Sequence, residues 1–227
     1  MERKEIICSA YRMTGGNNFY DGMITCSTLS GKVVCRLVWA MNKAENDDYL
    51  EKALSGIPEN FSGKLLEVPV GTGILTMPVY QTMPEADITC LDYSVDMMGQ
   101  AREKAEHLHL KNVTFRQGDV GSLPYADDTF DIVLSLNGFH AFPDKEAAYR
   151  EVFRVLRPGG TFCGCFYVKD EHRRTDWFVR HVYEKTGFFT PPYETASGLK
   201  NRLARVYAAV TIGHVKSMAW FVCRKAD

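Results

Sequence analysis

Two glycines that could form part of a ligand site, Gly71 and Gly73, follow the apolar, strand-like segment Lys64 to Val68. Glycine adopts torsions that other residues avoid and lets a ligand approach the main chain closely. Glu67 lies near the end of the same segment, where a buried acid is costly unless a partner satisfies it. The turn, with Thr72 at its centre, therefore indicates a site for a ligand with a cationic amino-acid group, although a Gly-x-Gly turn alone is a weak indication.

A second carboxylate, Asp92, ends the next apolar segment, Asp87 to Leu91. Its two oxygens could accept hydrogen bonds from both hydroxyls of a ribose. Nucleotide cofactors of more than one class are held in this way. The alternative is that Asp92 only caps the helix that follows, and the glycine turn favours ribose binding over capping.

Further polar residues follow the third and fourth segments of the same kind. Gly118-Asp119-Val120 could serve an adenine, with Asp119 accepting from the exocyclic amine and Val120 packing on the ring, although Gly-Asp is also a common turn. Asn137 and His140 follow Phe130 to Leu136. His140 is the best candidate for a base because histidine titrates near neutral pH, but a histidine that packs or shapes a substrate pocket is the more common case.

These residues are positioned by strands that alternate with helices. Strands are expected at 64–68, 87–91, 112–116, 130–136 and 161–168, and helices at 74–83, 95–109 and 145–156. This alternation predicts an α/β fold, a Rossmann-like, doubly wound and mostly parallel sheet. Two last strands, about 207–213 and 217–224, are expected to pair as an antiparallel hairpin through residues 213–216. Ligands of such sheets bind beyond the carboxyl ends of the strands.

Taken in order, the motifs resemble the small-molecule branch of class I S-adenosylmethionine (SAM) dependent methyltransferases, which includes ubiquinone- and menaquinone-type C-methyltransferases. The resemblance covers residues 60–168 strongly. Each motif is weak but the ordered set is specific, and it consists of Glu67 to Gly73, Leu91 to Met97, Gly118-Asp119 with Leu123-Pro124, Asp128 to Val133 and Val155 to Gly160.

The resemblance implies that SAM is the cofactor and that a small molecule is the methyl acceptor. It places Glu67 near the methionine ammonium, Asp92 on the ribose diol and Asn137 at the sulfonium end. The residues assigned to the cofactor are Glu67, Gly71, Thr72, Gly73, Asp92, Tyr93, Asp119, Val120, Asn137 and, in the N-terminal segment, Tyr20, with Tyr11 as a second tyrosine that could cover it. Pro69 departs from the family pattern, which has glycine there, and proline has a fixed φ and no N–H donor.

Two other functions stay open. A SAM-binding protein without transferase activity fits the same motifs, because Pro69 is unusual and no base is certain. An NAD-dependent oxidoreductase is less favoured, because its fingerprint requires Gly or Ala where Thr76 stands. No metal is expected, since the chain has neither a His-Glu-x-x-His motif nor an acidic cluster with ligand spacing.

The segments outside the alternating region are expected to form a lid. Residues 1–62 are predicted to be a helical cap, with apolar residues at near-helical spacing from Lys32 to Leu54, and residues 63–227 the SAM-binding core. Within the core, 170–200 is an aromatic insertion with a helix at 174–185 and another near 196–205. Its aromatic residues, which suit a small, partly apolar substrate, are Trp177, Phe178, Phe188, Phe189 and Tyr193.

The composition and the apolar pattern argue against several kinds of partner and location. The net charge of -1 gives no excess of positive charge for nucleic acid. No apolar run suggests a secretory signal or a membrane span, so we expect a soluble, cytoplasmic protein. With seven cysteines and no C-x-x-C pair, disulfides are not expected. Cys163 and Cys165 would share one face of a strand, where a core role is favoured over a soft-metal site. The oligomeric state is open.

Overall fold

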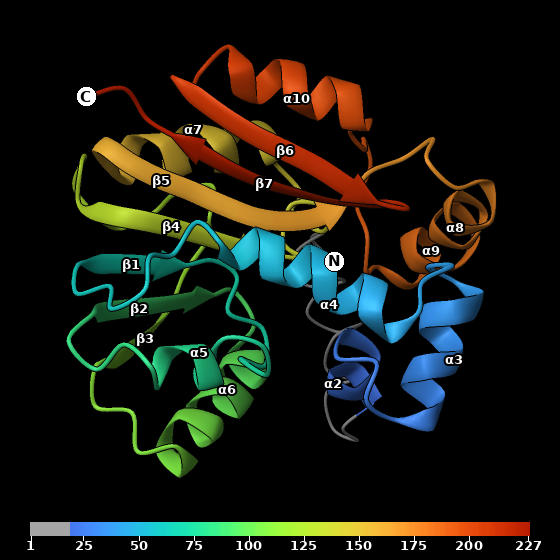
Figure 1. The fold of residues 1–227 in the computed structure, drawn as a ribbon, viewed down its shortest axis with the longest axis horizontal. Helices are drawn as coiled ribbons and strands as arrows, with labels where there is room; N and C mark the ends of the chain where they lie inside the picture. The colour runs from blue at the N-terminus through green and yellow to red at the C-terminus, as the bar shows by residue number, and fades with distance from the viewer. Residues whose placement is uncertain (1–18) are drawn as a thin grey trace.

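The computed structural model describes residues 19–227, so Tyr11 and Cys8 lie outside the described residues. Within them, one sheet has the strand order β3-β2-β1-β4-β5-β7-β6 (Figure 1). Pairs among the first five strands are parallel, whereas β7 runs antiparallel to both β5 and β6. The predicted α/β fold with a C-terminal hairpin is confirmed. The strands are β1 (Lys64–Glu67), β2 (Asp87–Asp92), β3 (Val113–Gln117), β4 (Phe130–Leu136), β5 (Leu156–Tyr167), β6 (Ala209–Val215) and β7 (Met218–Arg224).

Helices cover both faces of this sheet, as the crossover connections of a parallel sheet require. In Figure 1, α4 crosses in front of the sheet and α7 lies behind it. The helices are α2 (Phe19–Ile24), α3 (Leu29–Leu37), α4 (Lys43–Leu54), α5 (Met77–Tyr80), α6 (Val95–His107), α7 (Lys145–Val155), α8 (Arg173–Phe178), the π-helix η1 (Val179–Tyr183), α9 (Glu184–Thr186) and α10 (Ala196–Ala204).

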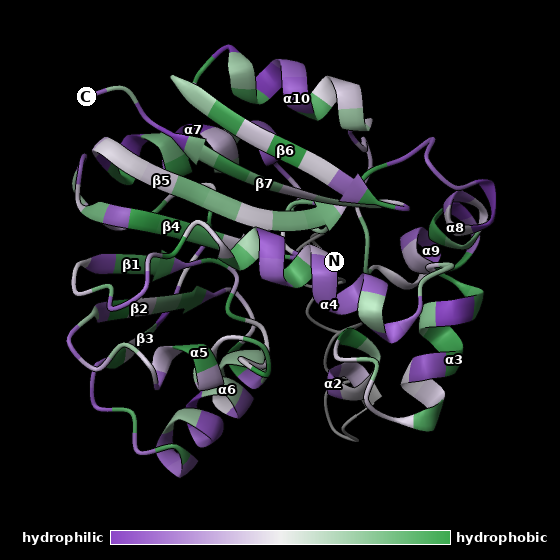
Figure 2. Ribbon diagram, in the orientation of Figure 1, coloured by the Kyte–Doolittle hydropathy of each residue, from purple (hydrophilic) through white to green (hydrophobic). Residues whose placement is uncertain are grey.

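Neighbouring residues of a strand pack into two separate hydrophobic cores, because successive side chains point to opposite faces of the sheet. Leu65 and Leu134 belong to the core beneath α4, α5 and α6, whereas Leu66 and Val133 belong to the core beneath α7 and α10. All four side chains are fully buried. Figure 2 shows β4 as largely hydrophobic and α6 as banded with hydrophilic residues. β1 and β4 are thus buried on both faces, and this packing fixes where their carboxyl ends lie.

Some element boundaries differ from those expected. The helix predicted at 74–83 is only α5, because Pro78 lacks an N–H and is accommodated only in a first helical turn. The stretch 32–54 forms two helices, because the chain turns at Ala40, with a φ of 56°, and Asn42 then caps α4 through a capping box. Strand β5 begins at Leu156, and the β6–β7 turn lies at Lys216, which has a φ of 51°.

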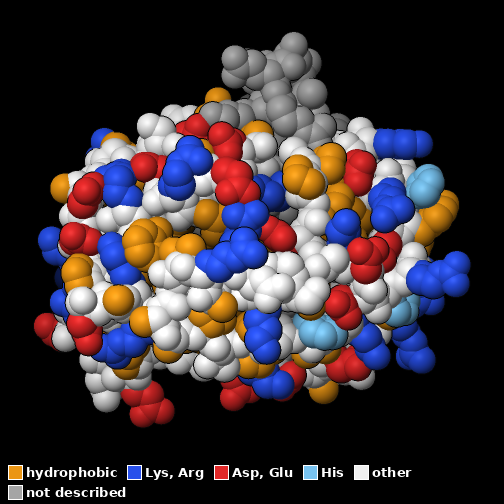
Figure 3. Space-filling view, turned by 90° about the horizontal axis from the view of Figure 1, so that it is seen from above, with side chains coloured by type: hydrophobic (Ala, Val, Ile, Leu, Met, Phe, Trp, Pro, Cys, Tyr) orange, Lys and Arg blue, Asp and Glu red, His pale blue; other side chains and the backbone are white. Residues whose placement is uncertain are grey.

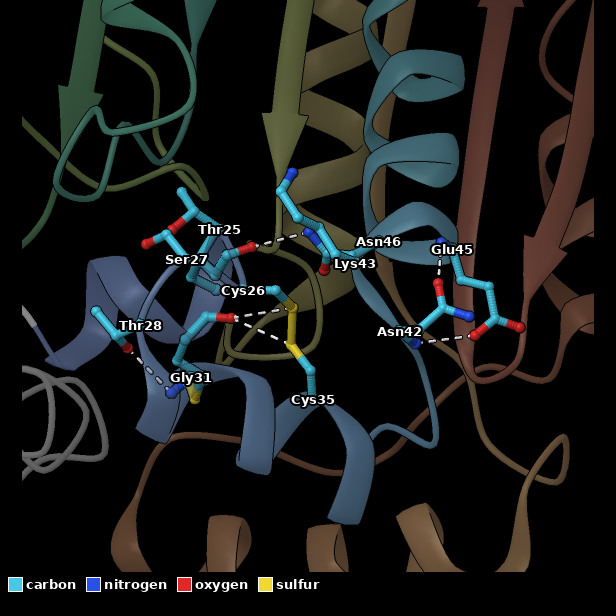
Figure 4. The surroundings of a disulfide bond; sticks show 12 residues. Thr25, Cys26, Ser27, Thr28, Gly31, Cys35, Asn42, Lys43, Glu45 and Asn46 are labelled. Carbon is cyan, nitrogen blue, oxygen red and sulfur yellow. Dashed lines mark hydrogen bonds between the residues drawn. A yellow bond between two sulfur atoms is a disulfide. The ribbon is translucent and has the colours of Figure 1, made fainter.

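A disulfide joins Cys26, after α2, to Cys35 in α3 (Figure 4). The expectation of no disulfide was wrong, since the turn between these helices brings their Cα atoms to 6.5 Å, within the range a disulfide spans. Both sulfur atoms also lie within 3.9 Å of the Met23 carbonyl oxygen. Cys163, Cys165 and Cys223 are free and buried, as a core role requires.

Candidate functional site

The loop after β1 lines a cavity at the carboxyl edge of the sheet, which we call the glycine cavity. It encloses about 1010 Å³ of empty space, including its open mouth. Gly71 and Gly73 have φ values of 56° and 68°, a region that favours glycine. A Cβ on Gly73 would lie 2.9 Å from Met77 Cγ, whereas one on Gly71 would meet no atom within 4 Å. The main chain at Gly71 is therefore open to close approach by a ligand.

Pro69 enters this loop through a cis peptide bond after Val68. Its ring packs against Gly138, beyond β4, where an added Cβ would lie 2.3 Å from Pro69 Cδ. The departure from the family pattern is thus accommodated by a second glycine, on the neighbouring strand connection. Sequence reasoning missed Gly138, because nothing in its local pattern indicates a contact with residue 69.

Asp92 also lines the glycine cavity and is hydrogen-bonded to the glycine loop at Gly71. Its Oδ2 accepts from the Gly71 N–H and its Oδ1 from the Ser94 N–H, both at 2.8 Å. Burial raises the pKa of Asp92 to about 6, against the opposing effect of these backbone donors. Ser94, not Asp92, is the N-cap of α6. Each carboxylate oxygen has a second lone pair, so the side chain remains able to accept ribose hydroxyls.

Glu67, at the end of β1, is 1% exposed and lines the same cavity. Its Oε2 accepts from the Tyr80 hydroxyl at 2.8 Å, and the Cys90 thiol lies 3.7 Å away. Burial raises the pKa of Glu67 to about 8, outweighing the effect of these donors. Both partners are neutral, so a cationic ligand group would provide the charge partner that a buried carboxylate needs.

The other predicted cofactor residues also line the glycine cavity. Val120 is buried, and Asp119 Oδ1 accepts from the Gly121 N–H at 3.0 Å. Tyr20, on α2, is brought near Asp92, and burial raises its pKa. Thus residues from five separate segments meet here. The full predicted set in the lining is Glu67, Gly71, Thr72, Gly73, Asp92, Tyr93, Asp119, Val120, Asn137 and Tyr20.

The N-terminal helix α2 is fastened to the glycine loop by an acid that sequence reasoning missed. Asp21 accepts a hydrogen bond from the Thr72 hydroxyl and forms an ion pair with Lys104 at 3.0 Å. Asn46, on α4, donates to the Ile24 carbonyl at 3.1 Å. These contacts hold α2 so that Tyr20 and Ile24 line the glycine cavity.

A second cavity adjoins the first, and we call it the aromatic cavity. It encloses about 1070 Å³ of empty space, and Tyr20, Ile24 and Asn137 line both cavities. Its walls come from α2, α3, α4 and the 170–200 region. Phe178, Phe188 and Phe189 of the predicted aromatic insertion line it, whereas Trp177 and Tyr193 do not.

Two aromatic residues in its wall, Trp39 and Tyr183, were missed from the sequence. They stack at 5.9 Å between ring centroids, and Tyr183 stacks on Phe189 at 5.1 Å. The N-terminal and 170–200 segments also contact each other directly, since the Thr175 hydroxyl donates to the Val38 carbonyl at 2.6 Å. Contacts between segments so far apart leave no signal in either local pattern.

His140 lines the aromatic cavity, not the glycine cavity. Its ring stacks on Phe189 at 3.8 Å between centroids, and its Nδ1 accepts from the Tyr167 N–H at 3.3 Å. Burial, with a smaller contribution from Lys145, lowers the pKa of His140 to about 3. A neutral imidazole with Nδ1 engaged has little capacity to accept a proton, so this geometry favours a packing or substrate-shaping role over a base.

Three observations on the described residues concern surface charge, metal binding and membrane spanning. Figure 3 shows Lys and Arg side chains interspersed with Asp and Glu over the face in view. Across residues 19–227, no three His, Cys, Asp or Glu side chains are grouped in a way that could hold a metal ion. None of the described helices is both long enough and apolar enough to span a bilayer.

Comparison with known proteins matches residues 62–205 to a family model described as a methyltransferase domain. The chain is 38% identical over 119 residues to 2-methyl-6-phytyl-1,4-hydroquinone methyltransferase 2 of Oryza sativa subsp. japonica, covering 52% of this chain and 32% of the relative. It is 38% identical over 97 residues to demethylmenaquinone methyltransferase of Thermus thermophilus, covering 43% and 44%. The matches thus span less than half the length of these relatives.

Among solved structures, a SAM-dependent methyltransferase of Thermotoga maritima, described as a possible histamine N-methyltransferase, matches with a TM-score of 0.68. The identity is 17%, and the match covers 99% of this chain and 100% of that one. A possible exported protein of Bordetella parapertussis matches with a TM-score of 0.73 at 15% identity, covering 92% and 79%. At such identities the likeness concerns the fold.

Proposed function

Because the chain belongs to the methyltransferase-domain family, we propose that it transfers the methyl group of SAM to a small-molecule acceptor. The observation that carries the proposal is the junction of the two cavities. A cavity lined by glycines and three carboxylates opens, at Tyr20, Ile24 and Asn137, onto a cavity lined by aromatic side chains. That arrangement suits a polar cofactor on one side and an acceptor on the other.

The glycine cavity fits SAM by its donor set. Asp92 would accept from the ribose hydroxyls, and Glu67 would face the methionine ammonium as a carboxylate. The open main chain at Gly71 would admit the methionine part, where an added Cβ meets nothing within 4 Å. Asp119 and Val120, which also line the cavity, would hold the adenine.

When bound, SAM supplies an activated methyl group, and the sulfur keeps the electron pair of the bond that breaks. The acceptor atom supplies the pair for the new bond, and the proton it loses passes to solvent. The protein therefore has to align the acceptor and exclude water, which is worth about 7–11 kcal/mol in favourable cases. Tyr20 and Ile24, held over the junction by Asp21, would provide that enclosure. The described part of the cap, residues 19–62, and the insertion 170–200 would together act as the lid, whereas residues 1–18 of the predicted cap lie outside the described residues.

Turnover of methyl-labelled SAM to S-adenosylhomocysteine, followed over a panel of small neutral and charged acceptors, tests this proposal. We expect product with at least one acceptor and labelled methyl recovered on it. A matched sample without acceptor controls for spontaneous decay. Tight binding of SAM without turnover of any acceptor would instead favour a SAM-binding protein that is not a transferase.

A further inference from the structure

One side of helix α3 is covered with apolar side chains that face solvent. Leu29, Val33 and Leu37 are 82%, 48% and 54% exposed, and their spacing of four residues places them on one helix face. Val34 and Cys35, on the other side of the helix, line the aromatic cavity. The exposed row belongs neither to that lining nor to the two hydrophobic cores, and we call it the α3 stripe.

Further exposed apolar side chains lie on the neighbouring helices α8 and η1. Trp177 and Val182 are 53% and 38% exposed. One helical turn before Trp177, Arg174 donates from Nη2 to the Arg36 carbonyl at 2.8 Å, and Figure 1 shows α8 next to α3. Five of the eight large hydrophobic side chains that are exposed within residues 19–227 therefore lie on these adjoining helices. We call the exposed side chains of α3, α8, η1 and the following α9 the cap surface.

The cap surface is basic, although the whole chain has a net charge of -1. Its helices contain two acids, of which Asp176 is buried and Glu184 is half-buried. Asp170 and Glu171, just before α8, lie 3.8 and 3.7 Å from basic side chains outside the cap surface. Six cationic residues of these helices are all exposed, and they are Lys32, Arg36, Arg173, Arg174, Arg180 and Lys185. The exposed charge beside the α3 stripe is therefore almost entirely positive.

We propose that the cap surface docks the protein on a bilayer that contains anionic lipids. In this contact the α3 stripe and Trp177 enter the boundary between headgroups and acyl chains, and the six cations lie against lipid phosphates. An amphipathic helix with cations beside its apolar face binds such a surface in this way, and tryptophan is enriched at the same depth. The bilayer then lies against the place where the lining of the aromatic cavity reaches the surface, at Val182.

Lipid accounts for both the apolar and the basic part of the cap surface, whereas other occupants account for one of them. Nucleic acid offers phosphates to the six cations, but it would leave the leucine and valine side chains of the α3 stripe in water. A second copy of this chain would cover the stripe, but it would bring six cations against six cations, and like charges across an interface are costly. Charge complementarity and apolar cover together therefore favour an anionic bilayer.

Flotation of the full chain with lipid vesicles, in the absence of SAM, tests the docking independently of methyl transfer. The vesicles consist of phosphatidylcholine alone or of phosphatidylcholine and phosphatidylglycerol in equal parts. We expect binding to the mixed vesicles to be stronger by on the order of tenfold or more, because several cations contribute. An ionic strength of about 1 M, at which the Debye length is about 3 Å, should weaken it. Equal binding to both kinds of vesicle, or binding to neither, overturns the proposal.

Two valines with the same exposure offer a matched pair of variants. Val33 lies in the middle of the α3 stripe and Val206 lies after α10, and each is 48% exposed. Val33→Asp and Val206→Asp change the net charge equally, but only the first places a carboxylate in the docking surface. We expect V33D to bind the mixed vesicles on the order of tenfold more weakly than the wild type, and V206D to bind as the wild type does. Equal binding of the two variants would show that α3 does not meet the bilayer.

The fluorescence of Trp177 gives a second measurement, which does not depend on the folding of V33D. Bromine atoms on lipid acyl chains quench a tryptophan that lies among them. With brominated mixed vesicles we expect quenching in the wild type and little in Trp177→Phe, because the remaining tryptophans, Trp39 and Trp220, are half-buried. Vesicle binding without quenching, or the same quenching in W177F, contradicts the proposed contact.

Duplex DNA and sedimentation velocity test the other occupants of the cap surface. We expect DNA to bind more weakly than the mixed vesicles, and V33D and V206D to have the same oligomeric state. DNA binding as tight as vesicle binding would assign the cations to nucleic acid and overturn the proposal. An oligomer that V33D disrupts and V206D preserves would assign the α3 stripe to a second copy of the chain, with the same consequence.

Discussion

The carboxyl of Glu67 is buried beside neutral hydrogen-bond partners, Tyr80 and Cys90, so ligand binding should be coupled to the loss of its proton. With its pKa raised to about 8, Glu67 is mostly protonated at pH 7 in the free protein. If the methionine ammonium binds beside it, the carboxylate form is favoured and a proton is released. Calorimetry of S-adenosylhomocysteine binding at pH 7, in buffers of different ionisation enthalpy, should detect this release in the wild type and not in Glu67→Gln.

The same raised pKa makes the stability of the free protein depend on pH. Between the unfolded value of about 4.5 and the folded value of about 8, the folded state binds more protons than the unfolded state. The free energy of unfolding should therefore fall as pH rises through this window, by up to about 1.4 kcal/mol per pH unit. A wild-type protein with the same slope as Glu67→Gln would contradict the assignment.

Much of the glycine cavity could be predicted because its residues follow the ends of parallel strands. Strand ends can be read from local apolar patterns, and they converge in any such sheet. Gly138 and Asp21 could not be found in this way. Gly138 matters for its contact with Pro69, and Asp21 for its contacts with Thr72 and Lys104. Both depend on segments distant in sequence. The roles of the cavity residues stay predictions.

The strand connection after β4 is packed against the glycine loop too tightly for a larger residue. In Gly138→Ala, the new Cβ would lie 2.3 Å from Pro69 Cδ and 2.7 Å from Phe142 Cζ. Overpacking of this kind costs about 1–3 kcal/mol, and relief requires the glycine loop to move. We expect a lower free energy of unfolding and weaker S-adenosylhomocysteine binding by calorimetry.

Gly99→Ala is the matched control for Gly138→Ala. Gly99 lies within α6, and an added Cβ there meets nothing within 4 Å. Alanine in a helix interior is favoured over glycine by about 0.5–1 kcal/mol, so this variant should be as stable as the wild type or more so, with unchanged binding. A Gly138→Ala protein that behaves like Gly99→Ala would show that the Pro69 contact does not position the loop.

The disulfide between Cys26 and Cys35 closes a short loop and holds α2 against α3. For a sequence separation of 9, the chain-entropy model gives a stabilisation of about 2–3 kcal/mol. Reduction should lower hydrogen-exchange protection in α2 and α3 and leave α6 unchanged. The double variant Cys26→Ser/Cys35→Ser serves as the control, since reductant should have no further effect on it. Equal protection in the oxidised and reduced protein would mean that the disulfide does not hold the cap.

Element types were predicted better than element ends. Strand β4 has the expected bounds, because its apolar run is bordered by polar residues at both ends. The segment 74–83, which was expected to be a helix, consists mostly of turns. The prediction followed the helical spacing of its apolar residues and gave too little weight to Pro78. The disulfide was missed because its basis is a turn between two short helices, which cysteine count and spacing do not reveal.

The two segments outside the sheet meet over the site, and this arrangement predicts a ligand-dependent lid. The N-terminal helices touch the glycine loop through Asp21 and the 170–200 region through Val38. With S-adenosylhomocysteine bound, hydrogen exchange should slow in residues 20–55 and 170–200 as well as at Gly71 to Gly73. Protection confined to the carboxyl edge of the sheet would mean that these segments do not respond to the cofactor.

The central claim, that the glycine cavity binds SAM, is tested most directly by calorimetric titration of wild type and Asp92→Ala with SAM and, separately, with NAD. We predict one SAM per chain in the wild type, no binding of NAD, and a loss of about 1–3 kcal/mol in SAM binding for Asp92→Ala. Asp87→Ala, at the exposed opposite end of the same strand, should bind as the wild type does. Binding of NAD in place of SAM, or unchanged SAM affinity in a folded Asp92→Ala protein, would contradict the claim.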